Sequence, residues 1–201
     1  MLVETYENEK TSQIVKIHTD DDAESPRQWD NLGTMICMHN NYTLGDDMVE
    51  SSEELNEILK EEKPVIQMPL YLIDHSGISM STNDYGDMWD SGCVGMIYAT
   101  REKILDSMTG WNGTKRMPMK KRLTKKMLEQ AKEILKSEVE TYAQYLEGNV
   151  YGYILYNKSR CDHDEEHLDH EDSCWGFYMG DKEDSLDVFL NGYGGNRKDW
   201  K

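Results

Sequence analysis

The sequence predicts an α+β fold: a mostly antiparallel or mixed sheet, with one long helix at about 124–146 packed across it and short helices at its periphery. Two observations support this. Strand-like apolar segments follow one another with only short helical segments between them, which favours antiparallel or mixed pairing. One stretch also keeps helical spacing over about six turns, through Met127, Leu128, Ala131, Ile134, Leu135, Val139, Tyr142 and Leu146.

The first half of the chain begins with a strand at 13–18, where QIVKIH alternates and is rich in β-branched residues. An acidic loop follows and leads to a second strand at 34–39. A serine at 51 or 52 suits a helix N-cap, because Glu54 comes two or three residues later. We expect this short helix to end before Pro64.

The middle of the chain adds a buried strand at 65–74, in which Pro69 prevents regular pairing on one side. A short strand at 79–81 turns back on it, another strand occupies 94–100, and a short helix reaches about residue 108.

Beyond the long helix, strands are expected at 150–156 and 174–178, joined by an acidic, histidine-rich connection. A last short helix covers 184–190. The sequence contains no internal repeat and no long linker, so we expect residues 1–201 to form a single acidic domain.

The charge is strongly negative, with 39 acidic and 22 basic residues and a net charge of −17. The segment 115–126 carries seven basic residues and no acid, so the remainder of the chain is at −24. Such a surface repels phosphates and argues against nucleic acid as a ligand, whereas it attracts a basic protein. The residues expected to contact that partner are Asp20, Asp21, Asp22, Glu24, Asp46, Asp47 and Glu50.

The basic segment 115–126 has two interpretations. It is a solvated loop, or it makes a homo-oligomer by docking on the acidic face of a second copy.

The start of the chain has no basic region followed by an apolar run, and no apolar stretch is long enough to cross a bilayer. We therefore expect a cytoplasmic protein without membrane contact. The four cysteines, Cys37, Cys93, Cys161 and Cys174, are expected to be reduced thiols.

Metal-ligand residue types gather in the segment 161–174, CDHDEEHLDHEDSC. If it were helical, histidines four residues apart would share one face and could grip Zn²⁺. The candidate ligands are Cys161, His163, His167, His170 and Cys174, but their spacing matches no zinc signature and an acidic loop is the favoured interpretation. The acidic run 20–24 also lacks the alternating pattern that wraps Ca²⁺. No cofactor is therefore expected.

Three segments place Asp beside Ser or Cys and Gly, at 74–77, 89–92 and 172–176. They could supply a catalytic site from Asp74, His75, Asp90 and Cys174, with Ser76 as a second nucleophile and His39 as a second base. The favoured interpretation is turn chemistry, in which Asp and Ser cap turns and Gly adopts the permissive dihedral angles. The chain has no G-x-S-x-G elbow and no phosphate-binding glycine loop.

The segments WDNLGTM, MPLYLIDHSG, WDSGCVG and DSCWGFY resemble a family of hypothetical proteins of tailed phages that infect Gram-positive bacteria. The resemblance spans most of the chain. It implies an early or accessory phage protein acting in the host cytoplasm, and it brings no catalytic or binding residues with it.

Two classes of function remain open. The favoured one is a binding protein that blocks a host defence factor or a nucleic-acid-binding protein by charge mimicry of DNA. The alternative is a small metal-dependent or hydrolytic enzyme built on the Asp, His and Ser residues of the turns.

Overall fold

The computed structural model describes residues 1–75, 77–86, 89–108, 122–160, 166–180 and 184–201. Contacts within the chain divide it into two compact units. Unit 1 combines Met1–Glu24 with Glu147–Lys201, and unit 2 is the continuous segment Ser25–Leu146. Each of these units has a hydrophobic core of its own.

Unit 1 is a four-stranded antiparallel sheet with two C-terminal helical elements. In sheet order its strands are β1 (Leu2–Asn8), β2 (Gln13–Thr19), β8 (Val150–Arg160) and β9 (Glu166–Tyr178). The helical elements are α4 (Ser185–Tyr193) and the 3-10 helix η2 (Arg197–Asp199).

The core of unit 1 lies between the sheet and α4. The odd-numbered side chains of β2 point into it, so Val15 and Ile17 are buried while their neighbours are partly exposed. The Phe189 ring of α4 packs edge-on against Tyr153, with 4.8 Å between ring centroids. This alternation is the period-two pattern that predicted the 13–18 strand.

Unit 2 is a five-stranded mixed sheet with helices on its faces. In sheet order its strands are β4 (Asp47–Met48), β3 (Thr34–Cys37), β7 (Ser91–Ala99), β5 (Ile66–Asp74) and β6 (Ile78–Ser81). Its helices are η1 (Pro26–Gln28), α1 (Ser52–Glu62), α2 (Arg101–Ser107) and α3 (Lys125–Glu147), whose last residue is assigned to unit 1.

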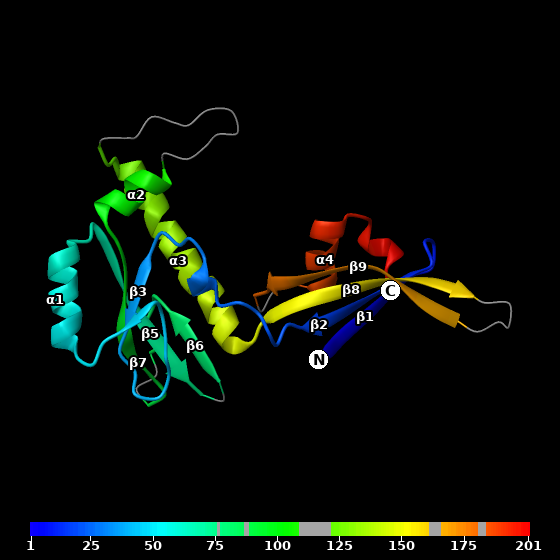
Figure 1. The fold of residues 1–201 in the computed structure, drawn as a ribbon, viewed down its shortest axis with the longest axis horizontal. Coiled ribbons are helices and arrows are strands. Elements are labelled where there is room, and N and C mark those ends of the chain that lie inside the picture. The colour runs from blue at the N-terminus through cyan, green and yellow to red at the C-terminus, as the bar shows by residue number, and fades with distance from the viewer. Residues whose placement is uncertain (76, 87–88, 109–121, 161–165, 181–183) are drawn as a thin grey trace. The chain divides into compact units, whose positions relative to one another are not determined.

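The sheet of unit 2 buries both of its faces. Met35 and Cys37 of β3 point into the core that includes Leu135 and Val139 of α3. Ile36, between them, points into a smaller core with Leu55 of α1. Figure 1 shows α3 and α1 on opposite sides of this sheet. The long helix therefore packs across a sheet, as the sequence predicted.

Most predicted elements are present with small shifts in their ends. Ser51 is the N-cap of α1, and its side chain accepts from the Glu54 backbone N–H. Pro69 pairs with β7 only, because β6 begins its pairing with β5 at Tyr71. This is the one-sided pairing that a strand proline requires.

The prediction is wrong for much of the histidine-rich connection. Residues 166–173 belong to β9, which is 13 residues long and pairs with β8 along its length. Two further strands, β1 and β4, were not predicted, because their side chains are largely exposed. Within the described ranges, no helix is long and apolar enough to span a membrane.

Candidate functional sites

The topology of unit 2 brings two of the three predicted turns together. Both β3 and β5 pair antiparallel with β7, so they run parallel to each other and end at the same end of the sheet. The segments after β3 and β5 and the segment before β7 therefore meet there. Asp74 is the last residue of β5, His75 follows it, and Asp90 immediately precedes β7.

A histidine–carboxylate pair forms at this end. The His75 Nδ1 atom lies 2.9 Å from Asp90 Oδ2, and the Asp74 backbone N–H donates to the Asp90 carbonyl at 2.8 Å. The His75 side chain is 72% exposed and that of Asp90 40% exposed. The pair can orient an imidazole for proton transfer, but it lies in water rather than in a desolvated pocket. Ser76, the predicted nucleophile beside it, lies outside the described residues.

Tyr42 extends this group, although the sequence analysis does not select it. Its hydroxyl donates to Asp74 Oδ2 at 3.0 Å, and this hydrogen bond raises the pKa of Tyr42. The Tyr42 ring also stacks on His39, with 4.9 Å between centroids. A tyrosine 32 positions before its aspartate gives no local sequence signal, so only the fold could reveal the pairing.

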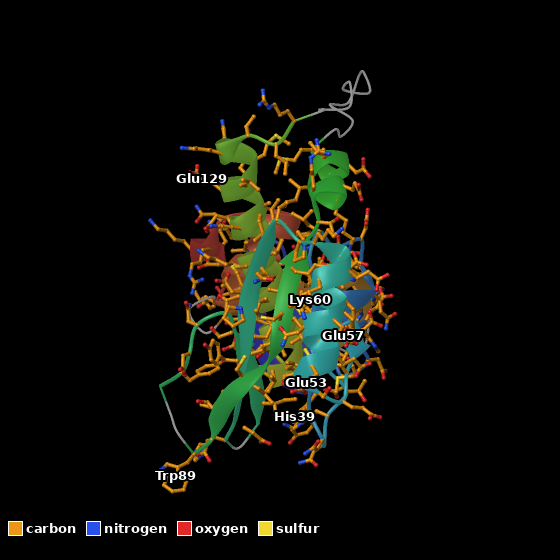
Figure 2. The ribbon with its side chains drawn as sticks, turned by 90° about the vertical axis from the view of Figure 1, so that its left-hand side faces the viewer. His39, Glu53, Glu57, Lys60, Trp89 and Glu129 are labelled. Carbon is orange, nitrogen blue, oxygen red and sulfur yellow. The ribbon has the colours of Figure 1, made fainter. Side chains whose placement is uncertain are left out.

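His39 is held in a defined orientation at the end of β3. Its Nδ1 atom accepts from the backbone N–H groups of Asn41 and Tyr42, both at 3.2 Å. An Nδ1 atom that accepts leaves Nε2 to carry the proton in the neutral ring. In Figure 2, His39 lies beyond the Glu53 end of α1, whereas Trp89 projects away from the sheet and is 93% exposed.

A recess of about 680 Å³ lies beside His39. Its volume is in the range of small-molecule sites. Its walls are mostly polar loop residues rather than the apolar surface typical of such sites, and they comprise Met38, His39, Asn40, Asn41, Met48, Val49 and Glu50.

The third predicted turn is not a turn. The segment 172–176 lies inside β9 of unit 1. The Cys174 thiol is exposed, and Gly176 takes a left-handed φ of 82° at an irregularity of the ladder. Gly152 of β8 is needed here because a Cβ atom at that position would lie 2.2 Å from the Trp175 ring. The prediction that Cys174 shares turn chemistry with Asp74 and Asp90 is therefore wrong.

The helical spacing that the disfavoured metal site would need is not found among the candidate ligands that the structure describes. Cys161 and His163 lie outside the described residues. His167, His170 and Cys174 belong to a strand, in which residues four apart are not stacked on a helix face. No group of three or more His, Cys, Asp or Glu side chains suited to a metal occurs in the part of the chain that the structure describes.

Among the predicted partner contacts, Asp46 has an internal role. Its carboxylate accepts from Arg27 at 2.9 and 2.6 Å and from the Met35 backbone N–H at 2.7 Å. The Arg27 side chain is only 4% exposed and also lies 3.5 Å from Glu138. The Glu138 carboxylate accepts from the backbone N–H groups of Leu32 and Gly33 at 2.7 and 3.0 Å. Asp46 thus helps to fix the loop before β3.

The other predicted contacts are on the surface. Asp20 accepts from the Gly176 N–H of β9 at 3.1 Å, and Asp21 lies 3.5 Å from the terminal amine. Asp22, Glu24, Asp47 and Glu50 are exposed. Of all the predicted contacts, those between Asp20 and Glu24 belong to unit 1, whereas Asp46, Asp47 and Glu50 belong to unit 2.

A second cluster of acidic residues lies on β9, in the segment that was predicted to be a loop. Three carboxylates accept hydrogen bonds from neutral donors: Asp169 from Ser159 at 2.8 Å, Glu171 from Gln13 at 2.7 Å and Asp172 from Tyr153 at 3.0 Å. Burial, followed by this last bond, raises the pKa of Tyr153 to about 12. We call Asp169, Glu171 and Asp172 the β9 carboxylates. Neutral donors orient them without cancelling their charge.

The negative charge is concentrated in unit 1. Its residues include 20 acidic and 8 basic side chains, whereas unit 2 has 19 acidic and 14 basic side chains. The basic segment 115–126 belongs to unit 2, and of this segment only residues 122–126 are described.

Comparison with known proteins adds no assignment, because no family model, no curated protein and no solved structure matches this chain. The two groups of residues described above are therefore interpreted from their geometry and charge.

Proposed function

We propose that the protein is an acidic phage accessory protein that acts in the host cytoplasm by binding and inhibiting a basic host protein. The partner is a defence factor or a nucleic-acid-binding protein, which would otherwise contact DNA phosphates. The observation that carries the proposal is the set of β9 carboxylates, which are exposed, are oriented by neutral donors and form no ion pair with a cation among the residues that the structure describes.

Charge and the sequence resemblance support the same proposal. Unit 1, with 20 acidic against 8 basic residues, attracts a cationic surface and repels nucleic acid itself. The resemblance to phage proteins points to a host component as the target. Fixed carboxylates also lose less side-chain freedom on binding than mobile ones do, which favours a tight complex.

Affinity capture tests this proposal. The full chain is immobilised, exposed to lysate of a Gram-positive host at about 50 mM salt and eluted at about 500 mM, where exposed charge pairs are screened. We expect a basic protein to be retained and then eluted, and its activity to fall when the purified chain is added. Recovery of no basic protein would overturn the proposal.

The matched variants remove equal charge from two places. Asp169→Asn, Glu171→Gln and Asp172→Asn together keep the hydrogen-bond acceptors of β9 and remove three charges. Glu57→Gln, Glu61→Gln and Glu129→Gln remove three exposed charges from unit 2. Only the first set should weaken capture. Equal weakening by both sets would mean that net charge alone is responsible.

The alternative function is a small hydrolytic or metal-dependent enzyme, and the His75–Asp90 pair at 2.9 Å is the observation that favours it. Its test is turnover of ester, phosphoester and peptide substrates by the purified chain, with and without added divalent metal. His75→Ala and Asp90→Asn should abolish turnover while His167→Ala does not. Activity that persists in both site variants would eliminate this alternative.

A further inference from the structure

The two edges of the unit 1 sheet differ. At the β1 edge, Glu7 exchanges two backbone hydrogen bonds with Lys201, at 2.9 and 3.0 Å. At the β9 edge, no strand of the described residues pairs on the outer side. In the part of the chain that the structure describes, the downstream end of this edge is covered, because Asp20 accepts from the Gly176 N–H. An exposed edge of this length offers a row of backbone donors and acceptors to another chain.

The upstream part of β9 is regular enough to accept a strand. Residues 166–170 pair one to one with residues 160–156 of β8, before an irregularity at Glu171. In an antiparallel ladder, alternate residues direct their N–H and C=O groups away from the partner strand. This stretch therefore presents outward backbone groups at about every second residue.

The side chains beside this edge differ between the two faces. Asp169 and Asp172 lie opposite Asn157 and Leu155 of β8, and therefore on the face that carries α4. Leu168 and His170 lie opposite Lys158 and Tyr156, on the other face, where Leu168 is 40% exposed. An added strand would therefore meet carboxylates on one face and a partly apolar surface on the other.

Charge selects among the strands that could occupy this edge. A second copy of β9 would bring its own carboxylates against these, and like charges on neighbouring strands are destabilising. A segment with Lys or Arg at alternate positions would instead place its cations beside Asp169 and Asp172.

We propose that the edge of β9 between Glu166 and Ser173 accepts an extended basic segment of the partner protein as a fifth β-strand. Lys or Arg residues at alternate positions face Asp169 and Asp172, and apolar residues between them cover Leu168. Backbone pairing supplies affinity, and the alternating side chains supply specificity. This inference rests on the proposed function and specifies how the partner is held.

Synthetic peptides test the backbone pairing. The probe is a fluorescent seven-residue peptide of alternating Lys and Val, measured by anisotropy with the full chain at about 50 mM salt. Two analogues carry N-methyl groups at alternate residues, one on each edge of the extended peptide. Only one edge of an added strand bonds to β9, so one analogue should lose at least about tenfold in affinity while the other is little changed.

Side-chain variants test the location. Asp169→Asn with Asp172→Asn should weaken the unmodified peptide by about three- to tenfold at low salt, since exposed charge pairs are individually weak. Glu9→Gln with Glu147→Gln, which removes the same charge from exposed positions elsewhere in unit 1, should have little effect. Amide exchange of residues 166–173 should slow when the peptide is bound.

The outcomes separate this inference from the proposed function. If both methylated analogues bind like the parent peptide, or if exchange on β9 does not change, strand addition is wrong while binding by charge stands. If sedimentation shows that β9 pairs with a second copy, strand addition by a basic partner is also wrong. If neither the peptide nor any basic host protein binds, the proposed function fails as well.

Discussion

The two units use acidic residues in opposite ways. In unit 2, Asp46 and Glu138 surround the buried Arg27 side chain. Glu138 also bonds to the backbone of the loop before β3, and Asp46 bonds to the backbone of β3 itself. In unit 1, the β9 carboxylates bond to Ser, Gln and Tyr at the surface. Composition alone treats all of these residues as one acidic surface. The structure separates carboxylates that stabilise the fold from carboxylates that lie exposed at the surface.

The largest expected effect comes from removing the buried cation of unit 2. Arg27→Ala leaves Asp46 and Glu138 without their counter-charge and should lower the free energy of unfolding by about 3–5 kcal/mol. Hydrogen exchange should accelerate in β3 and α3. Arg197→Ala, which removes an exposed cation of unit 1, should cost far less, because solvent screens exposed ion pairs. Similar losses in both variants would remove the distinction between the two units.

Two glycines test packing in each unit. A Cβ atom at Gly95 of β7 would lie 2.1 Å from the Ile36 carbonyl oxygen, which the sheet holds in place. At Gly152 of β8 the obstacle is the Trp175 side chain, which can rotate away. We expect Gly95→Ala to cost at least about 3 kcal/mol and Gly152→Ala about 1–3 kcal/mol, with a change in tryptophan fluorescence in the second variant alone. Denaturant unfolding measures both, and the reverse order would contradict this explanation.

A smaller effect concerns pH, with opposite signs in the two units. Burial raises the pKa of Glu138 above its ordinary value of 4.5. The hydrogen bond from Arg197 lowers the pKa of Asp184 below its ordinary value of 3.8. The contribution of Glu138 to stability therefore falls as pH rises from 4.5 through its folded pKa. That of Asp184 is present above pH 3.8 and is lost as pH falls through its folded pKa.

Thermal melts of Glu138→Gln and Asp184→Asn between about pH 3 and 7 should show these opposite trends relative to the parent chain. Asp184 is 42% exposed, so solvent screening limits its effect to about 1 kcal/mol or less. If stability changed with pH in the same direction in both variants, burial and the Arg197 hydrogen bond could not be the causes of the two pKa shifts.

Sequence patterns predicted the elements that bury one face. The stripe along α3 and the Ser51 cap of α1 are local signals, and both elements form where expected. The strands β1 and β9 bury few side chains, so their sequences carry no period-two apolar pattern. Pairing with β2 and β8 determines them instead.

The candidate sites could be predicted only in part. Asp74, His75 and Asp90 were selected from turn chemistry, and the fold brings them together. The contribution of Tyr42 depends on the parallel course of β3 and β5, which no local pattern encodes. The internal role of Asp46 likewise depends on a buried arginine 19 residues away.

Unit 1 is built from two segments that are separated in the sequence by the whole of unit 2, so its strands are synthesised at different times. Unit 2 is complete once residue 146 has been synthesised, whereas β2 must wait for β8, which begins at Val150. Because domains generally fold as their residues emerge from the ribosome, unit 2 can form while β2, which pairs with β1, still lacks its second neighbour β8. The β9 edge of unit 1 therefore forms after unit 2 has been synthesised.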